Sequence, residues 1–195
     1  TCMADILRKK RPGLALMHLT AYDTLCHRHG PGASQLQAAF DSLDENLGLL
    51  LDAAGDSEVI VFSDHAQLPA ETPILANDLL VAMGHMQKDE DGTYLENTGA
   101  GCFFECSGGS GFLHPGELTA EQVAQVQAET ARLPGFGRFL RPEEMATCGR
   151  PHLPFGFAAQ PHYAVEAYDT GEKANHGYPL DYADYKVFWL HVGNN

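Results

Sequence analysis

Two short apolar runs flank a long segment with helical periodicity between residues 14 and 66, and this arrangement constrains the fold most. The runs are residues 14–19 and 58–62, and each has the length of a buried strand. The segment between them, residues 34–54, repeats apolar side chains at helical spacing and stops at Gly55, which can end a helix. Strand, helix and strand in this order predict a βαβ unit, with two parallel strands and a right-handed crossover.

Carboxylates and imidazoles closely follow both predicted strands. Asp23 and His27 follow the first strand, and Asp64 and His65 follow the second. Because both strands of a βαβ unit end at the same edge of the sheet, where ligands bind, we expect these four side chains to lie close together. Asp23 and His27 are four residues apart, so one helical turn or a tight loop would place both on one side. With a further histidine, they form a ligand set that suits zinc best, with manganese or iron as alternatives.

Each of these residues also has a non-functional interpretation. An isolated Asp-x-x-x-His pair often arises by chance, whereas Ser-Asp-His directly after a strand is the stronger signal. His18 alternates with apolar neighbours, and we expect it to be a hydrogen-bonded histidine of the core. The remaining histidines have no clear partner in the sequence, and they are His29, His85, His114, His152, His162 and His191.

The five cysteines are an odd number at low density, which is not typical of a disulfide scaffold. The sequence contains no Cys-x-x-Cys pair. We expect Cys102 and Cys106 to be buried small apolar residues, with a disulfide or a structural zinc site as the alternatives.

Charge and hydropathy exclude several classes of partner. A formal net charge of −14 would repel phosphate backbones, which argues against a nucleic-acid polymer as a partner. No apolar run is long enough to cross a membrane, and the first residues lack the apolar core of a signal peptide. The low cysteine content slightly favours the cytoplasm. The 195-residue chain does not begin with methionine, so we expect it to be a piece of a longer protein.

The rest of the chain alternates between helical and extended patterns. Two helices are expected to begin with capping boxes, at Ser34 with Gln37 and at Thr119 with Gln122. The glycine-rich segment 107–111 lacks the lysine of a phosphate-binding loop and is expected to be a hinge or turn. The other predicted elements are helices at 2–10, 72–83 and 119–133, a polar turn at 88–93, and strands at 99–106, 156–168 with a break at Pro161, and 186–192.

Three ordered motifs resemble the nucleotide pyrophosphatase/phosphodiesterase branch of the alkaline phosphatase superfamily. They are Asp-Thr-Leu-Cys-His-Arg-His-Gly-Pro at 23–31, Val-Ile-Val-Phe-Ser-Asp-His at 59–65 and His-Gly-Tyr at 176–178. The resemblance implies an α/β, alkaline-phosphatase-like fold with a mainly parallel sheet flanked by helices. Residues 1–195 would be the C-terminal part of such a catalytic domain, a fragment of a larger fold, with residues 67–175 as a small inserted α/β lobe.

The resemblance also implies two zinc ions. Asp23, His27 and His176 match the three ligands of one ion, and Asp64 and His65 match two ligands of the other. The family completes the second site with an Asp and a Thr or Ser nucleophile from earlier strand ends, for which this chain has no match. Cys26 and Ala66 depart from the family, which usually has glycine at both positions, and Cys26 could compete as a ligand or be merely tolerated.

The implied reaction is two-metal hydrolysis of a small phosphodiester or nucleotide substrate, through a covalent phospho-threonine or phospho-serine. The nucleophile would come from the missing N-terminal part of the same domain, so this chain alone is expected to be inactive. One alternative is a non-catalytic metal-binding fragment. Another is a superfamily relative that acts on sulfate esters, phosphonates or sugar phosphates.

Overall fold

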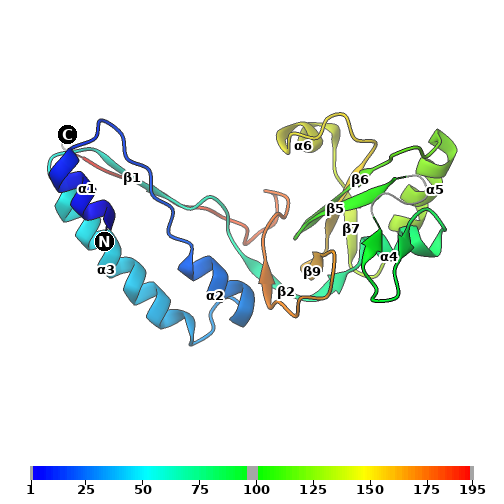
Figure 1. Ribbon diagram of the computed structural model, residues 1–195, viewed down its shortest axis with the longest axis horizontal. Coiled ribbons are helices and arrows are strands. Elements are labelled where there is room, and N and C mark those ends of the chain that lie inside the picture. The colour runs from blue at the N-terminus through cyan, green and yellow to red at the C-terminus, as the bar shows by residue number, and fades with distance from the viewer. Residues whose placement is uncertain (1, 96–100, 194–195) are drawn as a thin grey trace.

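The structure is a computed structural model that describes residues 2–95 and 101–193 (Figure 1). Its helices are α1 (Cys2–Lys10), α2 (Ala21–His29), α3 (Leu36–Ala54), α4 (Ala76–Ala82), α5 (Ala120–Thr130) and α6 (Pro142–Thr147). Its strands are β1 (Val59–Phe62), β2 (Leu68–Ile74), β3 (Gln87–Lys88), β4 (Tyr94–Leu95), β5 (Phe103–Ser107), β6 (Ser110–His114), β7 (Phe136–Phe139), β8 (Gly156–Ala159), β9 (His162–Val165), β10 (Ala174–Asn175) and β11 (Trp189–Val192).

The main core lies among β2 and the strands and helices that follow it. It packs β2, β5, β6, β8 and β9 against α4 and α5, and its fully buried large side chains include Phe104, Phe157, Leu80 and Leu113. Two sheets surround this core, with strand orders β5-β6-β8-β7 and β10-β2-β9. A smaller cluster, Cys26 with Leu36 and Ala174, joins α2, the start of α3 and β10. This second cluster places α2 against the chain segment that leads to His176.

The predicted βαβ unit is wrong in its strand pairing. Residues 14–19 form no strand in the structure, and β1 pairs antiparallel with β11, with Phe62 opposite Trp189. Periodicity identifies a segment that can be a strand but does not specify its partner, and the apolar run at 189–192 offers β1 a complementary edge. Residues 14–18 are exposed, because no neighbouring strand in the described chain receives them.

The expectation of a mainly parallel sheet also does not hold among the described strands. Only β2 and β9 pair in parallel, and every other described strand pair is antiparallel. The predicted helix 72–83 begins later, because residues 68–74 form β2, which is held by β10 on one side and β9 on the other. The helical part, α4, ends next to Gly84, whose φ of 75° favours glycine.

Several other elements are confirmed. The helices at 2–10, 34–54 and 119–133 correspond to α1, α3 and α5, and the extended segment 156–168 is two strands broken at Pro161. The polar turn at 88–93 joins β3 to β4, and 186–192 contains β11. The predicted strand 99–106 is β5 from Phe103 onwards, and its residues 99–100 lie outside the described residues. The inserted lobe at 67–175 stays a prediction, although most of the main core lies within that range.

The two predicted capping boxes have opposite outcomes. In α5, the Thr119 hydroxyl accepts from the backbone N–H of Gln122, and the Gln122 side chain accepts from the N–H of Thr119. In α3, the N-cap position is Gln35, one residue later than expected, and Gln35 has a helical backbone and forms no side-chain cap. The box at Ser34 and Gln37 is therefore wrong. The backbone turn from Ala33 that leads into α3 supplies the first hydrogen bonds instead.

Candidate metal centre

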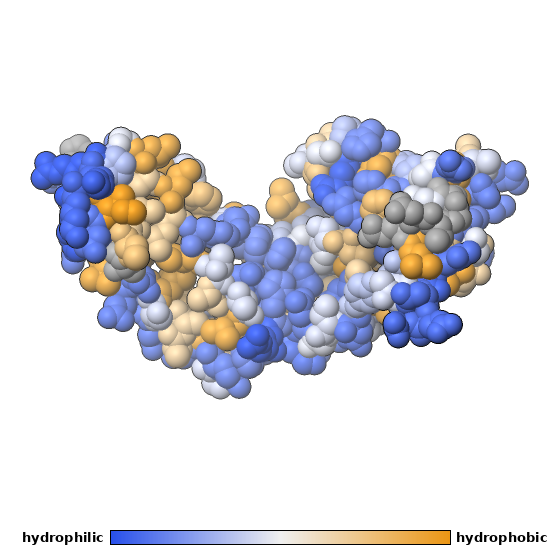
Figure 2. Space-filling view, in the orientation of Figure 1, coloured by the Kyte–Doolittle hydropathy of each residue, from blue (hydrophilic) through white to orange (hydrophobic). Residues whose placement is uncertain are grey.

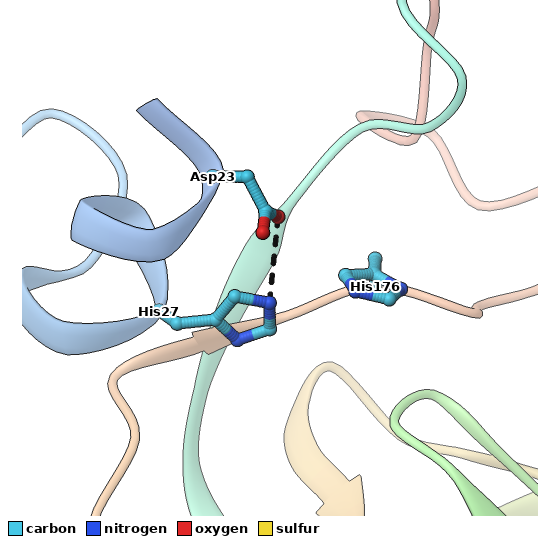
Figure 3. Close-up of side chains that lie close together, drawn as sticks. All are labelled: Asp23, His27 and His176. Atoms are coloured by element: carbon cyan, nitrogen blue, oxygen red, sulfur yellow. Dashed lines mark ion pairs between the residues drawn. The ribbon is translucent and has the colours of Figure 1, made fainter. Parts of the chain in front are cut away.

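Helix α2 presents Asp23 and His27 on one face, as a spacing of four residues requires. The His27 Nε2 atom lies 3.4 Å from Asp23 Oδ1, and both side chains point from α2 toward His176 (Figure 3). The helix ends at Gly30, whose φ of 85° favours glycine, and the Gly30 N–H donates to the carbonyl of Cys26. Asp23 and His27 therefore lie on a regular helix, where the sequence allowed either a helical turn or a tight loop.

His176 follows β10 and is held through its backbone by the turn between β5 and β6. Gly109 N–H donates to the His176 carbonyl at 2.6 Å, and the Ser110 hydroxyl donates to the Gly177 carbonyl at 2.8 Å. The Gly177 N–H donates to the Tyr185 hydroxyl at 2.9 Å. The glycine-rich segment predicted as a hinge or turn is thus a tight turn that positions His176.

Asp64 and His65 reach the same cluster from the segment between β1 and β2. The His65 ring stacks on His176 with centroids 3.8 Å apart, and its Nε2 lies 4.0 Å from Asp23 Oδ1 and 3.7 Å from Asp64 Oδ2. The His27 and His176 ring centroids are 5.1 Å apart. The structure therefore brings all five predicted ligands together, although helix α2 and the β10 segment do this rather than two parallel strand ends.

Asp23, His27 and His176 fit a metal ion best, because one ligand atom from each lies within 4.8 Å of the other two. Within the described chain, the ion pairs of Asp23, Asp64 and Glu172 are all with histidines and none is with lysine or arginine. The His27 Nδ1 faces Glu172, so a neutral ring would point its lone pair from Nε2 at a carboxylate. A cation between these two acceptors would remove that repulsion, and the nitrogen and oxygen donors suit zinc.

Burial affects two groups beside this cluster. It lowers the pKa of His176, with the imidazoles of His65 and His27 acting in the same direction and Asp23 opposing. The shift favours the neutral His176 ring, which is the form that binds a metal. Burial also raises the pKa of the Cys26 thiol, with a smaller effect from Asp23, and Cys26 packs in an apolar cluster. The shift disfavours the Cys26 thiolate, which is the form that binds a metal.

Three polar residues that the sequence did not single out also contact the candidate ligands. Gln67 donates from Nε2 to both the backbone carbonyl and the carboxylate of Asp23, and its own Oε1 is buried without a partner. Glu172 accepts from His27, and Asn175 accepts from the backbone N–H of His176. No spacing rule joins residues that are 145 positions apart, such as His27 and Glu172, so no local signal could have identified them.

His18 is not the core histidine that its alternating pattern predicts. Its side chain is 72% exposed, and its Nε2 lies 3.6 Å from Asp64 Oδ2. The alternation has no consequence here, because residues 14–19 do not join a sheet. Cys102 is buried as expected and Cys106 is partly buried. Both are free thiols, and among the described residues neither belongs to a group of side chains that could hold a metal ion.

Comparison with known families decides the identity. A model of the family described as type I phosphodiesterase / nucleotide pyrophosphatase matches residues 2–178. The chain belongs to this family. The motif resemblance is therefore confirmed, and the match includes all five candidate ligands. A search of curated proteins finds no match.

Solved structures of similar fold show how much of a relative this chain matches. The chain is similar to murine ectonucleotide pyrophosphatase / phosphodiesterase 5, as an inactive variant in complex with AMP, with a TM-score of 0.62 and 18% identity. The human protein of the same name gives the same TM-score with 19% identity. In both comparisons the match covers 88% of this chain and 44% of the relative. The α/β fold of the phosphodiesterase family is thus confirmed, and this chain spans less than half of the relatives' length.

A cavity of 540 Å³ elsewhere in the molecule does not include any of the five candidate ligands. Arg138 lines it, but this guanidinium is bound by Glu144 and Asp181 and is not free to bind a phosphate. Within the described residues, no helix combines the length and apolar character that crossing a bilayer requires. The compartment stays a prediction.

Proposed function

We propose that this chain carries the complete first zinc site and half of the second zinc site of a phosphodiesterase or nucleotide pyrophosphatase. The observation that carries the proposal is the convergence of Asp23, His27 and His176 in a member of the family. Asp64 and His65 lie beside them and would hold the second ion together with residues from an upstream part. The substrate would be a small phosphodiester or nucleotide.

The chain's own side chains would hold the first ion. Asp23 would supply a carboxylate and His27 and His176 would supply imidazoles, and zinc with three protein ligands can still bind substrate or water. When bound, a zinc pair would polarise the phosphoryl oxygens and activate the nucleophile. His65 stacks on His176 and restricts its rotation, and Gln67 holds the Asp23 carboxylate.

The upstream part is also supported by the apolar surface around β1 and β11. The paired strands expose Phe62, Trp189 and Leu190, and the segment after α1 exposes Leu14 and Leu16. Figure 2 shows hydrophobic residues on the surface over the part that contains α1, α3 and β1. Exposed apolar side chains that gather on one part of a molecule favour an interface. We assign it to the part of the catalytic domain that this chain does not contain.

The first test is zinc binding and turnover by the purified chain. We expect about one tightly bound zinc ion and little or no hydrolysis of a p-nitrophenyl phosphodiester, because the second site lacks ligands and a nucleophile. His27→Ala and His176→Ala are each expected to abolish tight zinc binding. His152→Ala is the matched control, since His152 is exposed and belongs to neither site.

Two results would contradict the proposal. Unchanged zinc content in both ligand variants would remove the first site. Steady hydrolysis by the chain alone, abolished by a chelator, would show that the upstream nucleophile is not needed. Extension of the chain upstream to the length of its relatives separates the enzyme from the alternative of a non-catalytic metal-binding fragment, since only the enzyme would gain a second zinc ion and turnover.

A further inference from the structure

The carboxylate of Glu172 joins two of the candidate ligands through hydrogen bonds. Its Oε2 atom lies 3.1 Å from Nδ1 of His27 and accepts from Nδ2 of Asn175 at 3.0 Å. The Asn175 amide oxygen in turn accepts from the backbone N–H of His176 at 3.0 Å. A continuous chain of hydrogen bonds therefore runs from the His27 ring to the backbone that carries His176.

The surroundings hold this chain of hydrogen bonds in place. The Glu172 side chain is 33% exposed and the His27 side chain is 17% exposed, while Asn175 is buried. The next residue, Lys173, donates its N–H to the His27 carbonyl at 2.7 Å and accepts from Ala70 at 3.1 Å. The backbone beside Glu172 is thus held between α2 and β2, which keeps the base of the Glu172 side chain next to His27.

The position of the carboxylate determines which nitrogen of His27 carries the proton. An ionised carboxylate only accepts hydrogen bonds, so the His27 Nδ1 that faces it must be protonated. In a neutral ring the lone pair then lies on Nε2, the atom that is 3.4 Å from Asp23. Glu172 therefore aims a metal-binding lone pair at the centre of the cluster.

We propose that Glu172 is a positioning residue, which fixes the tautomer and orientation of His27 for the ion and, through Asn175, the backbone of His176. A carboxylate behind a metal-bound histidine raises its basicity and restricts its rotation. The role in ion binding rests on the proposed function, whereas the effect on the His27 tautomer does not.

The first experiment measures zinc affinity by competition with a chromophoric chelator. Loss of such an outer partner typically weakens metal binding about 10–100-fold, and we expect a Kd increase of that size for Glu172→Ala. Glu172→Gln has the same shape, and its amide oxygen can still accept from Nδ1, so a smaller increase is expected. Glu117→Gln is the matched control, because Glu117 is an exposed carboxylate between β6 and α5, and this substitution should leave the Kd unchanged.

The second experiment identifies the His27 tautomer in the metal-free chain by long-range ¹H–¹⁵N NMR at pH about 8.5, where an ordinary histidine with a pKa of about 6.5 is neutral. We expect the Nδ1–H tautomer in the wild type and a predominantly Nε2–H ring in Glu172→Ala. The same tautomer in both proteins would overturn the proposal. An altered tautomer with an unchanged Kd would refute the role in ion binding, and absence of zinc binding by the wild type would refute the proposed function instead.

Discussion

Gly109 lies where the turn between β5 and β6 touches the segment that carries His176. A side-chain Cβ at this position would overlap the ring of Tyr178, and the Gly109 N–H already donates to the His176 carbonyl at 2.6 Å. Gly177, with a φ of 81°, would in turn push a Cβ into the carbonyl of Ser107. The two segments approach so closely that only glycine fits at these positions. This contact fixes the position of the His176 backbone.

Gly109→Ala should therefore displace His176. Overpacking of this kind costs about 1–3 kcal/mol, and we expect zinc affinity to fall as well, because a ligand moves. Urea unfolding and zinc titration measure the two effects. Gly48→Ala is the control, since Gly48 lies within α3 with no atom near its Cβ position, and it should stabilise the protein by about 0.5–1 kcal/mol. Unchanged zinc affinity in Gly109→Ala would contradict the positioning role of the turn.

Glu105 gives the protein a predictable sensitivity to acid. Hydrogen bonding to Arg150 lowers the pKa of Glu105 to about 2, against the effect of burial and with help from His114. Because the folded pKa lies below the ordinary value of 4.5, this stabilisation is present above pH about 4.5 and is lost as the pH falls toward 2.

At pH about 6, Glu105→Gln should have a lower free energy of unfolding than the wild type. At pH about 3, the difference between the two proteins should be smaller. Urea unfolding of the variant and the wild type at both pH values tests this. Glu144 is also held at a pKa of about 2, chiefly by Arg138, so the test is the difference between the two proteins. Glu117→Gln is the control, because Glu117 is exposed, and its unfolding free energy should not approach that of the wild type at low pH. An equal loss of stability in Glu105→Gln at both pH values would contradict the role of Glu105.

At the scale of elements, helices α3 and α5 differ in how they begin. Thr119→Ala removes a hydroxyl that caps α5 and should cost about 1 kcal/mol. Ser34→Ala, at the box that does not form, should change the unfolding free energy by only a few tenths of a kcal/mol. Urea unfolding of both variants measures the contrast. Equal losses would show that Ser34 caps α3 after all.

Helices α1, α3 and α5 could be predicted, because 3.6-residue periodicity is a local property of the sequence, whereas the start of α4 and the cap of α3 differ from the prediction. The partner of β1 could not, since residues 59–62 are compatible with any exposed edge and pair with residues 189–192. For the same reason, residues 14–19 have a strand's pattern without a strand's hydrogen bonds. Local patterns thus predicted several elements, and they did not predict how the strands pair.

The candidate ligands could be predicted from the three ordered motifs that contain them. The expectation that two parallel strand ends would bring them together was wrong. Asp23, His27 and His176 meet through α2 and β10, two elements whose contact no spacing rule specifies. Glu172 shows the remaining limit. It stands in a polar stretch with several acidic residues, and only the three-dimensional structure distinguishes the one that faces His27.

At the scale of the whole molecule, Trp189 reports on the proposed upstream part. It is the only tryptophan of the chain, it lies in β11, and it is 70% exposed. We expect its fluorescence to be readily quenched by acrylamide in this chain and protected in a chain extended to the length of its relatives, because the added part would cover β1 and β11. A free tryptophan amide gives the reference for full exposure. Equal quenching in both chains would contradict the assignment of this surface.

The candidate ligands are attached to different parts of the polypeptide. His176 is fastened to the main core by Tyr185 and the β5–β6 turn, whereas Asp23 and His27 belong to a helix that packs on α3. An ion held by all three would act as a removable cross-link between distant stretches of the backbone. A chelator would then remove one of the links between α2 and the segment of His176, and leave the Cys26 cluster and the hydrogen bond from Lys173 to His27 to hold α2 in place.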